Sequence, residues 1–207
     1  MVSSFLSEAD GREVEAAVAR VEAQTAAEVV VAVVPQSRQY WHGRVLSSVA
    51  WALAAGFAFL HFEPWREPAL ALLLELAVGA LVYAGCGLPS VLRRLVPASA
   101  ADRATHDRAF QLFAERGLYR TRAHTGLLIF ISELERRVVL LGDSGLHAEL
   151  GQQGWEQHVT LLVEQIRRGQ ARAGIIELLE RLTPQLVALA PRRVDDENEL
   201  PDSVLRA

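Results

Sequence analysis

Several residues with carboxylate or hydroxyl side chains lie at the ends of apolar runs in this 207-residue sequence. Their types and spacing could bind a metal ion. Carboxylate and hydroxyl oxygens are the ligands that hard cations such as Ca²⁺ and Mg²⁺ prefer. The candidate metal ligands are Thr25, Glu28, Thr125 and Asp143, with Thr121 in the same set. The same side chains could instead be structural: Thr25 and Thr125 would cap turns, and Asp143 would accept backbone N–H groups in a Gly-rich loop.

Standard catalytic signatures are missing from the sequence. It has no Gly-rich phosphate loop, no Gly-x-Ser-x-Gly elbow and no His-Glu-x-x-His motif. The six histidines are scattered, the one cysteine, Cys86, lies in an apolar run, and the net charge of −4 argues against a nucleic-acid partner. The catalytic residues therefore stay unknown. A phosphatase would need a nucleophile or a metal-bound water, and Asp143 is the one residue that is a candidate for that role.

Three strands position the candidate ligands. The β-branched run Val29–Val34 predicts a strand buried on both faces, and Leu127–Ile131 and Arg136–Leu141 predict two more. The short link 132–135 requires the last two to run antiparallel, whereas a helix over 101–116 joins the first two as a right-handed parallel crossover. The N-terminal ends of the first two strands and the C-terminal end of the third then share one pole, where the candidate ligands meet.

Helices complete the predicted domain. Ser7 is the expected N-cap of a first helix, with acidic residues in its first turn. Residues 142–145 are expected to form a loop, and an amphipathic helix follows over 155–168. Residues 175–189 predict a last helix, kinked or broken at Pro184. The acidic stretch 191–207 is expected to be an extended tail, either a solvated terminus or a docking strip for a partner.

Two apolar segments predict a transmembrane hairpin. Residues 45–62 contain no acid or arginine, and residues 69–91 contain one acid, Glu75. As helices they reach roughly 27 Å and 34 Å, enough for a hydrocarbon core of about 30 Å, and the link 63–68 permits only a tight turn. A buried hairpin in a water-soluble protein is the alternative, but so small a domain could hardly cover two helices that are apolar all round.

Glu75 is expected to need a partner or to be buried against protein, because an acid within a membrane span is costly. The candidate partners are His61 within the chain, another membrane subunit, or a second copy of this chain. The alternative is a carboxyl that is simply tolerated in its neutral form.

Several motifs, in order and spacing, resemble those of TPM domains. They are Glu22-Ala23-Gln24-Thr25-Ala26-Ala27-Glu28 with the strand that follows, Thr121-Arg122-Ala123-His124-Thr125-Gly126 with the next strand, Glu135-Arg136-Arg137-Val138, Gly142-Asp143-Ser144-Gly145-Leu146, and Trp155 with Arg167-Arg168-Gly169. The closing Asn198-Glu199-Leu200-Pro201-Asp202 resembles a bacterial subgroup with the same interrupted layout.

The resemblance implies a three-layer α/β/α domain with a mixed sheet, interrupted by the two-helix transmembrane hairpin. Its parts would be residues 1–40 for the first helix and strand, 45–91 for the hairpin, 95–190 for the rest of the domain, and 191–207 for the acidic tail. Some bacterial members of the family bind divalent cations, and some plant thylakoid members are described as acid phosphatases.

Two functions follow as expectations. The first is a membrane-anchored interaction, assembly or quality-control factor for membrane proteins, able to bind Ca²⁺ or Mg²⁺, with the bilayer and either other membrane proteins or a second copy as partners. The alternative is a metal-dependent acid phosphatase, which the family resemblance alone supports.

Arginine placement predicts the orientation in the membrane. Arg38 and Arg44 precede the first span and Arg93, Arg94 and Arg103 follow the second, whereas the turn holds only Arg66. By the positive-inside rule, the domain and both termini lie in the cytoplasm, at the inner (plasma) membrane. A reporter enzyme fused after Ala207 should be active in its cytoplasmic form. Activity of the periplasmic form alone would overturn the orientation.

Overall fold

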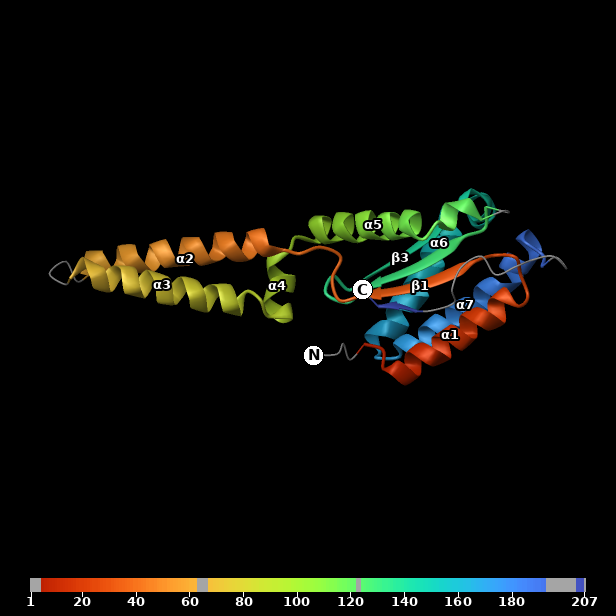
Figure 1. Ribbon diagram of the computed structural model, residues 1–207, viewed down its shortest axis with the longest axis horizontal. Helices are drawn as coiled ribbons and strands as arrows, with labels where there is room; N and C mark the ends of the chain where they lie inside the picture. Colours follow the sequence, from red (N-terminus) through yellow and green to blue (C-terminus); the bar gives the residue numbers. More distant parts are fainter. Residues whose placement is uncertain (1–4, 63–66, 122–123, 193–203, 207) are drawn as a thin grey trace. The chain divides into compact units, whose positions relative to one another are not determined.

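The computed structural model describes residues 5–62, 67–121, 124–192 and 204–206, and only the backbone of residues 147–154, 156 and 206. It is a mixed α/β fold (Figure 1). The elements in chain order are α1 (Glu8–Glu22), β1 (Val29–Val34), α2 (Trp41–Phe62), α3 (Pro68–Gly85), α4 (Pro89–Leu95), α5 (Ala98–Glu115), the 3₁₀ turn η1 (Leu118–Arg120), β2 (Leu127–Ser132), β3 (Arg137–Gly142), α6 (Ser144–Arg167), α7 (Ala171–Leu189) and β4 (Leu205–Arg206).

The chain forms two compact units. One consists of Met1–Ser37 together with Asp102–Ala207 and holds the sheet, and the other is Arg38–Ala101, which holds α2, α3 and α4. The second unit is therefore an insertion into the first along the chain.

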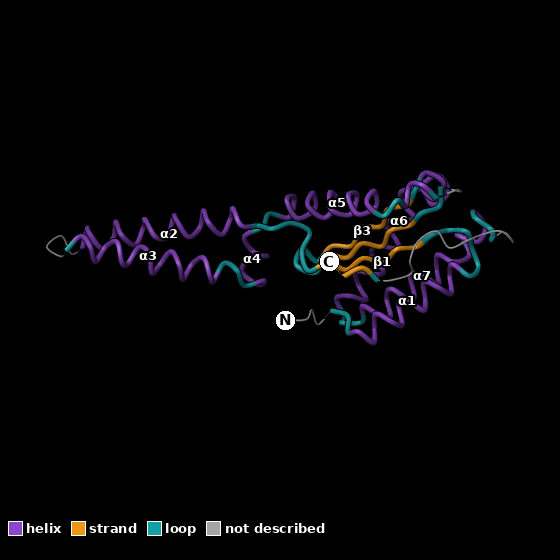
Figure 2. Tube along the Cα trace, viewed as in Figure 1, coloured by secondary structure: helices purple, strands orange, loops and turns teal. Residues whose placement is uncertain are grey.

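The sheet has the strand order β3-β2-β1-β4. Figure 2 draws its strands in orange. β1 and β2 are parallel, with Val29 opposite Leu127, although the whole insertion separates them in sequence. β2 and β3 are antiparallel, joined by the turn after Ser132. These directions and the three predicted strands are confirmed.

Each face of the sheet is buried under helices (Figure 1). Alternate residues of a strand point to opposite faces. Val29, Val31 and Val33 of β1 therefore pack in a core built with α1, α6 and α7. Val30, Ala32 and Val34 pack in a second core, which includes Ala109, Leu112 and Phe113 of α5. All six residues of β1 are buried, as its unbroken apolar sequence predicts.

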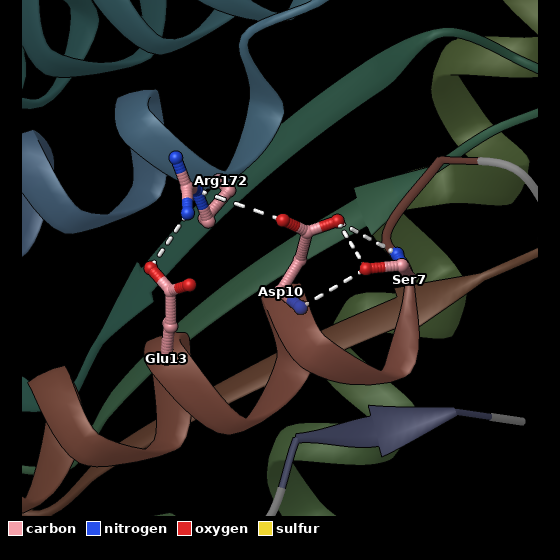
Figure 3. Close-up of polar contacts among 4 residues, drawn as sticks. All are labelled: Ser7, Asp10, Glu13 and Arg172. Atoms are coloured by element: carbon pink, nitrogen blue, oxygen red, sulfur yellow. Dashed lines mark hydrogen bonds and ion pairs between the residues drawn. The ribbon is translucent and has the colours of Figure 1, made fainter.

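Polar contacts fix the start of α1 and tie it to α7 (Figure 3). The Ser7 hydroxyl accepts a hydrogen bond from the Asp10 N–H at 3.1 Å, and the Asp10 carboxylate accepts one from the Ser7 N–H at 2.9 Å. This reciprocal capping satisfies two N–H groups at the end of the helix and confirms Ser7 as the N-cap. The guanidinium of Arg172 on α7 lies 3.6 Å from the carboxylate of Asp10 and 2.7 Å from that of Glu13.

The buried carboxylate of Glu135 holds the point at which the chain leaves the first unit. It accepts the Ser37 N–H at 3.0 Å and also contacts the Ser132 hydroxyl. The backbone of the same turn donates from Glu133 to the Val34 carbonyl at 3.0 Å. The end of β1 and the β2–β3 turn are thus joined before the insertion begins.

Two predicted boundaries are wrong. The second apolar helix ends at Gly85 rather than continuing to residue 91, because Pro89 holds Leu88 in an extended conformation (φ −68°, ψ 131°). Residues 142–145 are not a loop: α6 begins at Ser144, well before residue 155, with Asp143 as its N-cap. Glycines within its first turns, which disfavour helix, concealed this part of α6 from sequence reasoning.

Of the kink or break predicted at Pro184, the break is wrong. α7 runs from Ala171 to Leu189 without a break at Pro184. Its buried Leu182 and Leu186 lie on either side of the proline in one core, so packing outweighs the lost backbone hydrogen bond. The predicted tail contains a strand, β4, parallel to β1. The acidic residues 195–199 lie outside the described residues.

Gly126 allows the backbone of η1 to approach the start of β2. A Cβ atom on Gly126 would lie 2.2 Å from the Leu118 carbonyl oxygen. We expect Gly126→Ala to lower the free energy of unfolding by about 1–3 kcal/mol, the usual range for overpacking. Gln157→Ala, at an exposed position of α6, should change it by less than about 0.5 kcal/mol. Urea unfolding of the full chain in detergent micelles measures both, and equal stabilities would contradict the close approach.

Candidate functional site

The strand register gathers polar residues at one pole of the sheet. Val29 lies opposite Leu127, which lies opposite Gly142. The residues before β1, before β2 and after β3 therefore meet, as the strand directions predict. The Glu28 carbonyl accepts from the Leu127 N–H at 2.8 Å, and the Gly126 carbonyl accepts from the Asp143 N–H at 2.9 Å. We call this set of residues, Thr25, Glu28, Thr121, Thr125 and Asp143, the strand pole.

Buried threonine hydroxyls at the strand pole bond to backbone. The Thr25 Oγ1 lies 2.6 Å from the Ala190 carbonyl oxygen and 2.9 Å from that of Leu186. It also accepts the Ala27 N–H at 3.2 Å. Thr25 thereby fastens the end of α7 to the start of β1. These contacts are the kind expected if Thr25 has a structural role and is not a metal ligand.

Thr121 and Thr125 form a second set of backbone contacts at the strand pole. The Thr121 hydroxyl accepts the Thr125 N–H at 3.1 Å, and the Thr125 hydroxyl donates to the Ala26 carbonyl at 3.4 Å. Thr125 therefore connects the segments that lead into β1 and β2.

Asp143 combines a structural contact with a titratable neighbour. Its Oδ1 accepts the Ser144 N–H at 2.7 Å and so caps α6. Its Oδ2 lies 3.2 Å from the Nδ1 of His124, whose side chain is 64% exposed against 13% for Asp143. His124 has a positive φ of 53°. Sequence reasoning missed His124 as a neighbour of Asp143, although its place directly before Thr125 at the predicted pole was a usable signal.

The fit of a divalent cation at the strand pole can be judged from these contacts. Within the described ranges, no three His, Cys, Asp or Glu side chains come together around a common point. The hydroxyls of Thr25 and Thr125 already contact backbone carbonyls. A cation would therefore depend on the carboxylates of Asp143 and of Glu28, which is buried, with backbone oxygens completing its shell. The cation site stays a prediction.

The inserted unit offers a different kind of candidate surface. α2 and α3 are long and apolar enough to cross a membrane. Gly56 is the buried residue of α2 and Ala71 that of α3. Large apolar side chains point outward along both helices, among them Leu46 (73% exposed), Phe57 (75%) and Leu81 (73%). This apolar surface belongs to the pair α2 and α3, which we call the hairpin.

Small and polar residues form the seam between α2 and α3. The carboxyl of Glu75 fills the space over Gly56, where a Cβ atom would lie 1.7 Å from its Oε1. A Cβ atom on Gly79 would lie 3.5 Å from the Ala52 Cβ, which is an ordinary packing distance. Arg44 donates to the Tyr83 carbonyl at 3.2 Å, and its guanidinium lies 4.2 Å from the centre of the Tyr83 ring. Glu75 is therefore half-buried against its own hairpin, and no contact with a second subunit is needed to explain it.

His158 on α6 is a titratable group away from the strand pole. Burial, and then the positive charge of Arg181, lower the pKa of the His158 imidazole. His158 is half-buried. Both effects favour the neutral form of the imidazole.

Fold and site together define a mixed α/β domain with helices on both faces and an apolar helical hairpin inserted after its first strand. Residues 93–185, a little under half of the chain, match the model of the TPM domain family. The match includes α5, β2, β3, α6 and most of α7, whereas β1 precedes it and β4 follows it.

One solved structure is similar over the whole chain. It is the NMR structure of the BA42 protein from the psychrophilic bacterium Bizionia argentinensis, with a TM-score of 0.62 and 15% identity, covering 100% of this chain and 99% of that one. At that identity the similarity concerns the fold alone. The comparison with curated proteins found no match.

Asp143→Ala tests both roles of this side chain. Loss of the cap on α6 should lower the free energy of unfolding by about 1 kcal/mol. If the strand pole binds Ca²⁺, the same change should abolish the heat of binding in titration calorimetry of the full chain. Asp143→Asn keeps a capping oxygen but removes the charge, so it should restore stability and not binding. Equal Ca²⁺ affinity in wild type and Asp143→Ala would remove the site.

Proposed function

We propose that this protein belongs to the TPM domain family and is anchored in the inner membrane of a bacterium by the hairpin, with its α/β unit in the cytoplasm. The single observation behind the proposal is the exposure of large apolar side chains along both α2 and α3. Each Å² of such surface costs roughly 25 cal/mol in water, so helices like these are stable when lipid covers them. A water-soluble monomer rarely exposes an apolar patch of this extent.

The polar groups of the hairpin support the same placement. Glu75 is turned towards Gly56 in the seam, which keeps its carboxyl off the outward-facing apolar side. Arg44, near the start of α2, contacts the backbone and ring of Tyr83 near the end of α3. A charged residue is tolerated near the end of a span and is costly in the middle. These positions suit two helices that span a bilayer, with Arg44 at the cytoplasmic end of the pair.

We further propose that the α/β unit acts as an interaction or assembly factor for membrane proteins, with other membrane proteins or a second copy of this chain as its partners. The polar side chains of the strand pole largely bond to backbone, which suits a structural scaffold better than a reaction centre. Ca²⁺ or Mg²⁺ at Asp143 would then tune that scaffold. Because the hairpin would hold the α/β unit at the membrane, such a factor would meet its partners in the plane of the membrane.

Membrane extraction tests the anchor. The full chain should stay with the membrane fraction after an alkaline carbonate wash. Leu53→Arg combined with Phe57→Arg puts two charges on the exposed side of α2, at about 2.5–3.5 kcal/mol each on insertion scales, and should shift the chain out of that fraction. Tyr119→Arg, at an exposed position outside the hairpin, should leave retention unchanged. Release of the wild-type chain by carbonate would refute the anchor.

A phosphatase assay separates the two functions. The purified full chain in micelles should show no hydrolysis of a generic phosphomonoester above the blank, with or without Ca²⁺ and Mg²⁺. Hydrolysis that requires a divalent cation and disappears in Asp143→Ala would contradict a purely interacting role and favour the phosphatase alternative.

A further inference from the structure

Positive charge gathers at one end of the inserted unit. Residues 38–48, around the start of α2, and 84–101, after α3, contain four arginines and no Asp or Glu. The link at the opposite end of the hairpin, 63–68, holds one arginine and two glutamates. The first acid after α4 is Asp102, whose carboxylate lies 2.6 Å from the guanidinium of Arg137 on β3. The arginines are therefore not balanced by acids of their own stretches.

Arg44 is held in a fixed position at this end. Its Nη2 donates to the Tyr83 carbonyl at 3.2 Å, and its guanidinium lies 4.2 Å from the centre of the Tyr83 ring. A Cβ atom on Gly87 would lie 2.7 Å from the same Nη2, so the guanidinium also packs on the turn that leads into α4. In the part of the chain that the structure describes, the Nε of Arg44 and the Nε of Arg93 have no hydrogen-bond partner. Both guanidinium groups therefore keep donor capacity for an anion.

α4 and the residue before it are amphipathic. The apolar residues follow the spacing i, i+3, i+4, i+7 of one helix face: Leu88, Val91, Leu92 and Leu95. Arg93 and Arg94 lie off that face. Leu92 is buried, but Leu88 is 56% exposed and Leu95 is 44% exposed. Figure 1 shows α4 turned away from the direction of α2 and α3. A segment with an apolar face and basic residues suits the boundary between lipid headgroups and acyl chains.

We propose that Arg44, Arg93 and Arg94, which we call the basic end, bind the phosphate headgroup of an anionic phospholipid, with α4 lying along the membrane surface. The planar fork of an arginine matches the oxygens of a phosphate group. Each basic residue close to an anionic membrane surface adds about fivefold in affinity. The inference rests on the proposed anchor in one respect, which is that this end of the hairpin lies at a lipid surface.

The apolar surface around the basic end favours a lipid over a free phosphate ion. An inorganic ion would leave Leu88 and Leu95 uncovered, whereas a phospholipid offers phosphate to the arginines and acyl chains to the leucines. Trp41, at the start of α2, is 51% exposed, and Tyr83, near the end of α3, is 41% exposed. Tryptophan and tyrosine are enriched where a membrane protein meets the headgroups.

Lipid binding by the purified full chain in non-ionic micelles tests the site. The probes are phosphatidylglycerol and phosphatidylcholine, each with a dansyl group on an acyl chain, and energy transfer from the tryptophans reports binding. Phosphatidylglycerol should bind at least about tenfold more tightly than phosphatidylcholine. Arg93→Gln combined with Arg94→Gln should remove most of this preference.

The matched control is Arg167→Gln combined with Arg168→Gln, an exposed pair outside the inserted unit with the same loss of charge. It should leave the preference unchanged. Equal binding of the two lipids by the wild-type chain, or the same loss in both double variants, would refute the site.

Two further measurements separate charge from folding and lipid from free phosphate. Arg93→Lys combined with Arg94→Lys keeps the charge and should keep the preference within about threefold, so its loss would contradict recognition by charge. Glycerol 3-phosphate has the phosphate but no acyl chains. It should compete with the lipid only at concentrations about a hundredfold higher or more, and competition at equal concentration would overturn the lipid as the ligand.

The outcomes also tell this site apart from the anchor. Preference for phosphatidylglycerol in micelles, together with release of the chain by carbonate, would contradict the anchor and support the basic end as an anionic-lipid site. Retention after the carbonate wash without any lipid preference would support the anchor and overturn the site.

Discussion

The parallel pairing of β1 with β2 is the interaction on which the rest of the structure depends. Val29 and Leu127 face each other across the sheet although the whole insertion lies between them in the chain. Both buried cores include side chains of these two strands, so neither core can form until the chain returns after the insertion. The contacts of Glu135 with Ser37 and of Thr25 with Ala190 fasten the two ends of β1 to later parts of the chain.

The chain also combines two kinds of surface that suit different surroundings. In the α/β unit the large apolar side chains lie mostly in the two cores, whereas in the hairpin they point outward and the small residues lie inside. The seam illustrates this reversal of inside and outside. The ionisable Glu75 packs on Gly56, whereas Phe57, the next residue after Gly56, is 75% exposed. An apolar exterior with a compact small-residue seam is the arrangement expected of helices in lipid.

Sequence reasoning worked where the signal was local and strong. The β-branched run of β1, the short β2–β3 link and the Ser7 cap each carry their physical cause within a few residues. It failed where an element depends on contacts with residues far away in the sequence. β4 is two residues long and exists because β1 and Glu15 receive it, and α7 passes Pro184 because both of its halves are buried in one core.

The candidate site shows the same limit. Strand directions were enough to bring Asp143 and Thr125 to one pole, because a parallel and an antiparallel neighbour leave only one arrangement of ends. They could not say that the Thr25 hydroxyl would be used by α7, or that His124 would turn to Asp143, because these contacts depend on the placement of a distant helix and on a positive φ.

If the hairpin is an insert in a domain that is otherwise complete, the α/β unit should fold without it. Replacing residues 38–101 with a short Gly/Ser linker tests this most directly, and the Ser37 and Thr105 hydroxyl oxygens, 3.5 Å apart, show that a short link can close the gap. The measurement is thermal unfolding of this chain in buffer without detergent. We expect a soluble protein with a single cooperative transition. A chain that aggregates, or that melts without cooperativity, would contradict it.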